Sequence, residues 1–170
     1  MKYGSEAIIQ RIGLKTNRGV MSTPLSANMQ VKYNLDSDRT LLQVFSDWAD
    51  EHDHKVLMPF SANCSLDALR TCDTYIALTA DGQYLMGRIV ACGESWEAAN
   101  PPHTPYHKVP DGYMASSQLF WLALDDVEHG DAFDFTHWWM ISPSGTDMVS
   151  LEQAFKSSKV AMMYATRLNR

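Results

Sequence analysis

Apolar and polar residues alternate in short runs along this chain, and the period of the alternation predicts strands more often than helices. The strongest local signal is the pair Asp81-Gly82 between two strand-like runs, which predicts a β-hairpin. Pro59 is expected to end the strand that begins at Lys55. The expected strands cover residues 7–12, 30–33, 55–60, 74–79, 83–91, 118–127, 138–141 and 159–168, the last being equally compatible with a short helix.

Helical spacing of apolar residues is clearest over residues 38–49, where Asp38 is a suitable N-cap. Trp48 lies on the apolar stripe of this helix, which favours a place in the core over contact with a ligand. Two shorter helices are expected where Ser65 and Ser150 can act as caps, over residues 65–70 and 150–155.

A long irregular loop is predicted over residues 94–117, which hold four of the seven prolines. Loops of this length in a compact domain are usually functional or disordered. Short strands in a mixed sheet with two or three small helices predict an α+β fold, specifically a small mixed or antiparallel β-barrel. The 170 residues are within the usual size of one domain.

Charge is unevenly distributed along the chain, which has a formal net charge of -6. Residues 41–155 carry four Lys/Arg against seventeen Asp/Glu, whereas residues 1–40 carry six basic and three acidic side chains, and residues 156–170 carry four basic side chains and no acid. Solvated faces explain this asymmetry without any function. Alternatively, the two ends form one basic face on an acidic body, which would bind phosphate locally while suppressing general adhesion to nucleic acid.

Neither membrane insertion nor secretion is expected from the composition. No apolar run approaches the roughly 18 residues that a membrane-spanning helix needs, and residues 1–10 lack the apolar stretch of a signal peptide. The three cysteines, Cys64, Cys72 and Cys92, have no disulfide-framework spacing. We therefore expect a cytoplasmic protein with reduced thiols.

The sequence contains no complete catalytic or metal-binding pattern, and we expect neither a cofactor nor a metal. Cys64 precedes a predicted helix start, a place where thiolates are stabilised, but no nucleophile signature surrounds it. His103 and His107 are four residues apart, and Pro105 between them disfavours the helix that would align them. Zinc, phosphate-loop and dinucleotide motifs do not occur.

Aromatic residues concentrate in and after the long loop. Trp138 and Trp139 are adjacent on one predicted strand, so that one of them should face away from the core. Exposed rings beside polar groups are what a base-stacking pocket needs, although such rings can equally fill a small core. The set comprises Trp96, Tyr106, Tyr113, Phe120, Trp121, Trp138 and Trp139.

The order of these features resembles the EVE domains of the PUA-like superfamily, which also includes the YTH readers of methylated RNA. The resemblance covers residues 55–170; residues 1–30 have no counterpart and are an atypical N-terminal extension. Cys72 stands where the family usually has glycine before an aspartate, and residues 31–36 lack the usual Lys-Ser/Thr-Glu-Pro. The matching segments are 63–78, Gly82, 84–91 with its Gly-Arg-Ile-Val, Trp121 to Leu124, Val149-Ser150-Leu151 and Arg167-Leu168.

The resemblance implies a non-catalytic domain that recognises a nucleotide base, in particular a modified one, in DNA or RNA. A base would stack on an aromatic ring, be read at its edge by a polar side chain, and have its flanking phosphates held by arginines. The residues expected in these roles are Trp96, Trp121 or Trp138 for stacking, Asn63 for the edge, and Arg88, Arg167 and Arg170 for the phosphates.

Two other functions are compatible with the sequence. A phage or mobile-element protein that binds and inhibits a host enzyme could use an acidic body with an aromatic loop to cover a nucleic-acid site. A small hydrolase with Cys64 as its nucleophile is the third hypothesis.

Overall fold

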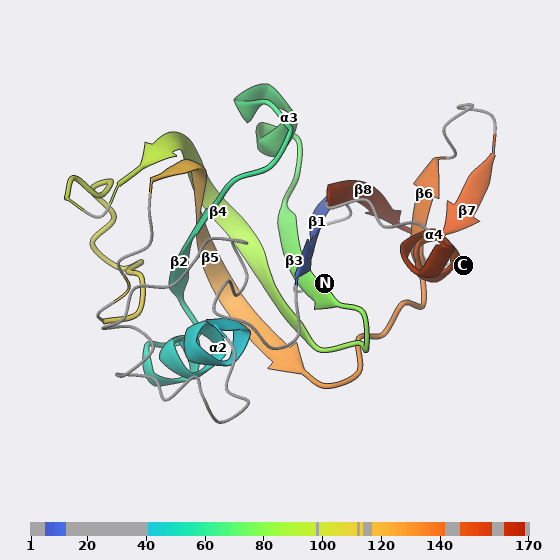
Figure 1. Ribbon diagram of the computed structural model, residues 1–170, viewed down its shortest axis with the longest axis horizontal. Helices are drawn as coiled ribbons and strands as arrows, with labels where there is room; N and C mark the ends of the chain where they lie inside the picture. Colours follow the sequence, from blue (N-terminus) through green and yellow to red (C-terminus); the bar gives the residue numbers. More distant parts are fainter. Residues whose placement is uncertain are drawn as a thin grey trace.

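The computed structural model describes residues 6–12, 41–97, 99–111, 113, 117–141, 147–157 and 162–168. Within these ranges the chain has an α+β fold, with three helices and an eight-stranded, mostly antiparallel sheet (Figure 1). The strand order is β2-β5-β4-β3-β1-β8-β6-β7, and among the described strands only the β1–β3 pair is parallel. The elements are β1 Glu6–Ile12, α2 Leu41–Glu51, β2 Val56–Phe60, α3 Leu66–Arg70, β3 Thr74–Thr79, β4 Tyr84–Trp96, β5 Gln118–Gly130, β6 Trp138–Ile141, β7 Met148–Ser150, α4 Leu151–Ser157 and β8 Met162–Arg167.

The sheet is open over the described residues, which corrects the prediction of a closed β-barrel. Its outermost strands are β2 and β7, and Figure 1 shows the sheet extending from β2 on one side of the molecule to the β6–β7 hairpin on the other. Closure would require hydrogen bonds between the two edges. The strand expected at residues 30–33 and the cap expected at Asp38 lie outside the described residues.

Most predicted elements are confirmed, because each rests on a local signal. Ser65 caps α3, with its Oγ accepting a hydrogen bond from Ala68 N at 3.1 Å, and Ser150 Oγ likewise accepts from Gln153 N at the start of α4. The Asp-Gly turn joins β3 to β4, with Gly82 at a φ of +97°. Residues 162–167 form a strand, not the alternative helix.

Two of the boundaries that differ from the prediction have identifiable reasons. Pro59 lies inside β2, which tolerates it because β2 is an edge strand. The hairpin strand β4 continues to Trp96, where it still pairs with Gln118 of β5, so the proline-rich loop begins after Trp96.

The sheet separates two hydrophobic cores. Successive residues of β3 alternate between them: Tyr75 and Ala77 belong to the core that includes α2, β2 and β5, whereas Ile76 and Leu78 belong to the core that includes α4, β6 and β8. Both faces of β3 are therefore buried, as is expected for a strand with a parallel neighbour. Each core borders one of the hollows described below.

Candidate functional site

A hollow of about 280 Å³ lies beside the proline-rich loop, and we call it the loop hollow. Its size is close to the lower end of the range for small-molecule pockets. Helix α2, strand β2, the end of β4 and the loop each contribute residues to its wall. These residues are Trp48, Leu57, Trp96, Pro101, Pro102, Thr104, His107, Lys108, Val109, Pro110, Asp111 and Tyr113.

Three aromatic rings form the inner part of this wall. Trp96 and Tyr113 are only 1% and 3% exposed, and their ring centroids are 5.5 Å apart. Tyr113 also packs edge-on against Phe45 of α2 at 5.3 Å. Trp48 is half-buried and stacks on His52 one helical turn later, with centroids 3.7 Å apart. The sequence assigned Trp48 to the core, whereas the structure places it between the core and the hollow.

Two buried polar atoms of this wall lack a hydrogen-bond partner among the described residues: Trp96 Nε1 and Tyr113 Oη. An unsatisfied buried donor costs about 1–3 kcal/mol, so such groups are rare without a reason. Burial raises the pKa of Tyr113 far above its ordinary range, which keeps the hydroxyl protonated and able to donate. Indole N–H can only donate. Two residues that border the hollow therefore carry buried hydrogen-bond donors without a partner among the described residues.

The rim of the loop hollow is attached to the sheet through Asp125 of β5. His107 Nε2 donates to Asp125 Oδ1 at 2.7 Å, and Lys55 Nζ lies 3.1 Å from the same oxygen. Burial alone would raise the pKa of Asp125, but the hydrogen bonds from His107 and Lys55 outweigh it and leave that pKa below its ordinary value. Leu57 N also donates to Lys108 O at 3.0 Å. These bonds hold the loop in place beside the sheet edge.

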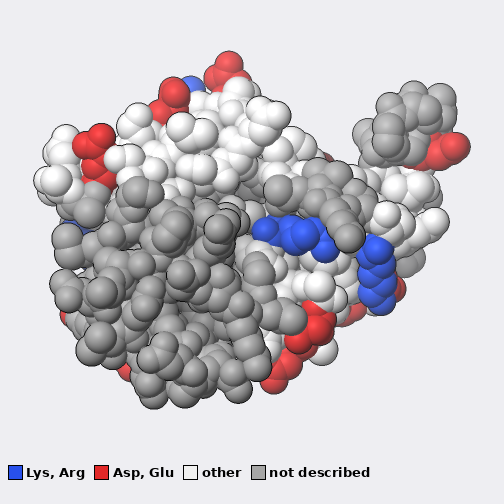
Figure 2. Space-filling view, viewed as in Figure 1, with Lys and Arg blue, Asp and Glu red and all other residues white. Residues whose placement is uncertain are grey.

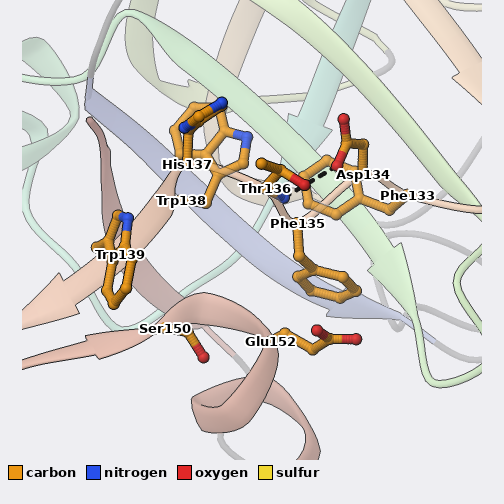
Figure 3. Close-up of a pocket in the computed structure, with 9 residues that line it drawn as sticks. All are labelled: Phe133, Asp134, Phe135, Thr136, His137, Trp138, Trp139, Ser150 and Glu152. Carbon is orange, nitrogen blue, oxygen red and sulfur yellow. Dashed lines mark hydrogen bonds between the residues drawn. The ribbon is translucent and has the colours of Figure 1, made fainter. Parts of the chain in front are cut away.

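A second and larger hollow, of about 480 Å³, lies between the β5–β6 connection and the start of α4, and we call it the aromatic cleft. Figure 3 shows Trp139 and Phe135 on either side of an open space, with Ser150 and Glu152 below it. The lining residues are Phe133, Asp134, Phe135, Thr136, His137, Trp138, Trp139, Ser150 and Glu152.

The three tryptophans expected to stack on a base are separated by the fold. Trp96 borders the loop hollow and Trp138 borders the aromatic cleft. Trp121 is half-buried and packs over Gly93 of the neighbouring strand. Trp138 is 3% exposed, which corrects its assignment as an open stacking ring. Of the adjacent pair it is Trp139 that is less buried.

The polar residues expected at the site are not gathered around one ring. Asn63 is exposed and borders neither hollow. The guanidinium of Arg88 pairs with Asp126 at 3.2 Å and with Asp125 at 3.4 Å. Two carboxylates therefore bind the group that was expected to bind a phosphate. Arg167 lies over the Trp138 ring, with Cζ 5.8 Å from its centroid. Arg170 lies outside the described residues.

A single basic face formed by the two chain ends is the alternative explanation of the uneven charge along the chain. Most basic side chains of residues 1–40 and 156–170 lie outside the described residues; Arg11, Lys156 and Arg167 are described. The described Lys and Arg visible in Figure 2 stand in small separate groups, with Asp and Glu between and around them.

The thiol of Cys64 has the opposite of the environment that a nucleophile needs. Burial raises its pKa, with a smaller opposing effect of a hydrogen bond with Tyr164. A raised pKa lowers the thiolate fraction at neutral pH. Within the described parts of the chain, no group of three or more His, Cys, Asp or Glu side chains is placed to hold a metal ion.

Sequence reasoning did not select Trp48 or His107 for the loop hollow, nor Phe135 for the cleft. Tyr113 and Trp139 were in the aromatic set noted from the sequence but were not among the residues expected to bind. His107 had no signal, because its partner Asp125 lies on a distant strand.

No family model, curated protein or solved structure matches this chain. None of the described helices is long and apolar enough to cross a membrane.

Proposed function

We propose that the loop hollow binds a single flat heterocycle, a nucleobase, and that the protein recognises this base without performing chemistry on it. The observation that carries the proposal is the pair of unpartnered buried atoms, Trp96 Nε1 and Tyr113 Oη, beside an aromatic-walled hollow. Every nucleobase has carbonyl oxygens or unprotonated ring nitrogens, and either kind of acceptor would satisfy them. A ring that binds here could also contact Trp48, and stacking is worth about 1–3 kcal/mol per base.

This proposal changes the residues that the sequence selected. Trp96 remains, while Tyr113 and Trp48 replace Trp121, Trp138 and Asn63. Arg88 acts indirectly, since its partner Asp125 also binds His107 at the rim. Membership of the PUA-like superfamily and selectivity for a modified base remain proposals. They are supported by the order of the elements in residues 55–170 and by the position of the hollow at the proline-rich loop.

The test is an NMR titration of the full chain with five-nucleotide single strands of DNA and RNA. The central base would be adenine, N6-methyladenine, cytosine or 5-methylcytosine. The Trp96 indole N–H signal is identified as the one missing from Trp96→Phe. We expect at least one strand to move this signal downfield and saturably, because the N–H gains an acceptor.

Tyr113→Phe removes only the hydroxyl and keeps the ring. We expect this substitution to lower the affinity for the strand that binds by about three- to tenfold, which corresponds to the loss of one hydrogen bond. Trp138→Phe is the matched control, since it alters a buried indole outside the hollow, and its affinity should equal that of the parent. Absence of a saturable shift at Trp96 with every strand would exclude base recognition in this hollow.

A further inference from the structure

The aromatic cleft has chemistry that differs from that of the loop hollow. Its residues come from the connection after β5, from β6 and from the junction of β7 with α4 (Figure 3). Two hydrogen bonds shape the connection: Trp138 N donates to Phe135 O at 3.1 Å, and Leu168 N donates to His137 O at 2.7 Å. The phenyl ring of Phe135 rests on Phe133 and Phe155 of the second core, with centroid distances of 5.0 and 6.3 Å.

Charge decides which ligands suit this cleft. Its nine lining residues include two carboxylates, Asp134 and Glu152, and neither lysine nor arginine. Asp134 Oδ1 accepts a hydrogen bond from Thr136 N at 3.0 Å, which holds the carboxylate in position. A phosphate would be repelled by both groups, whereas a cation would be attracted by them and by the faces of the rings.

Cations already occupy the surroundings of the cleft. Lys156 Nζ lies 2.8 Å from Glu152 Oε2, an exposed pair on successive turns of α4. The Arg167 guanidinium lies over the Trp138 ring, although Arg167 is not one of the residues that line the cleft. An exposed ion pair of this kind contributes little free energy and is readily exchanged for another cation.

We propose that the aromatic cleft binds a positively charged side chain of a protein partner: lysine, methylated lysine or arginine. The cation would lie between Trp139 and Phe135 and be neutralised by Glu152, with Asp134 adding to the negative charge of the cleft. This site is independent of the loop hollow, because the two share no lining residue. The net charge of -6 adds a general attraction for a basic partner.

The probes for this proposal form a matched set. They are Nα-acetyl-lysine N-methylamide, its trimethylated form, and Nα-acetyl-norleucine N-methylamide, which has the same stem without the ammonium group. The readout is the Trp139 indole N–H signal in NMR spectra of the full chain at low salt, identified through Trp139→Phe. We expect the two cationic probes to shift it saturably in the millimolar range. The norleucine probe should bind at least tenfold more weakly.

Substitutions at two exposed residues of α4 should change the affinity for the cationic probes in opposite directions. Glu152→Gln should lower the affinity for the cationic probes about three- to fivefold. Lys156→Gln should raise this affinity about two- to threefold, because it frees the Glu152 carboxylate. Asp67→Asn on α3 is the matched control: its side chain is 95% exposed, and it changes the net charge by the same unit as Glu152→Gln without altering the cleft.

Either of two results would overturn the proposal. Equal affinity for the lysine and norleucine probes would show that the cleft binds apolar chains without regard to charge. If a five-nucleotide strand shifts the Trp139 signal and binds more weakly to Lys156→Gln, the cleft is instead a site for nucleic acid. Both outcomes leave the loop-hollow experiment unaffected, because that experiment reads Trp96.

Discussion

At Gly93, the backbone of β4 passes directly beneath the indole of Trp121 on β5. A Cβ at this position would lie 2.5 Å from Trp121 Cε2 and Cζ2, well inside van der Waals contact. The two residues are paired across the strands. The contact shows that one side of the Trp121 ring packs on the sheet to which it belongs.

Gly93→Ala should therefore destabilise the protein by about 1–3 kcal/mol through overpacking. The free energy of unfolding is obtained from urea denaturation followed by circular dichroism. The double variant Gly93→Ala/Trp121→Leu should lose less than the sum of the two single losses, since the smaller side chain leaves room for the methyl group. If the two losses of unfolding free energy are additive, the clash at Gly93 is relieved by a shift of other groups and not by the Trp121 side chain.

At the scale of elements, capping signals were sufficient to locate two helices that are too short to be stable alone. Helix α3 spans five residues, and its Ser65 cap satisfies one of the unpaired N–H groups of the first turn. The side-chain acceptor is local, so sequence reasoning could identify it without knowledge of the fold.

Ser65→Ala should lower the free energy of unfolding by about 1 kcal/mol, whereas Ser65→Asp should retain most of it, because aspartate is also a good N-cap. Thermal denaturation of both variants measures the difference. Ser157→Ala, at the exposed end of α4, is the control and should change little. If Ser65→Ala is as stable as the parent, the cap is dispensable and α3 is held by tertiary contacts alone.

At the scale of the whole molecule, Asp125 joins segments that are far apart in the sequence. It binds Lys55 just before β2, Arg88 of β4 and His107 of the proline-rich loop. A bulge makes this possible: Met86 pairs with Glu128, while Arg88 pairs with Asp125, so that β5 contains an extra residue at this point. Asp126, at a φ of 53°, is thereby turned toward the same guanidinium.

This network predicts a pH dependence of stability. Because the pKa of Asp125 is lowered in the folded state, the unfolded chain binds a proton at higher pH than the folded chain does. The stabilisation by Asp125 is then complete above the ordinary Asp pKa of 3.8 and is lost as the pH falls through the lower folded value. Asp125→Asn should lower the free energy of unfolding at pH 7 by about 1–3 kcal/mol, because it leaves the network without its carboxylate.

Melting temperatures between pH 2.5 and 7 measure this effect. The parent should lose stability steeply at the acid end, and Asp125→Asn should show a shallower slope there. Asp67→Asn, on the exposed surface of α3, should keep the slope of the parent. Parallel curves for the parent and Asp125→Asn would contradict the role assigned to the network.

Much of the secondary structure could be predicted from the sequence, whereas the site could not. The Asp81-Gly82 turn and the Ser65 and Ser150 caps depend on neighbours within a few residues, and all three are present in the structure. Trp96 and Trp138 could be recognised as notable rings, but their burial depends on α2, α4 and the loop packing over them. Nothing local distinguishes a ring that will be covered from one that will stay open.

The sequence by itself determined the α+β class, the positions of the short helices and of most strands, and the position of the long loop, because periodicity, caps and turns are properties of neighbouring residues. Only the tertiary structure decided that the described sheet is open, that Trp96 and Tyr113 meet beside a hollow with unpartnered donors, and that Arg88 is paired with carboxylates. These features depend on strand pairing between distant segments, whose register is set by the packing of the whole chain.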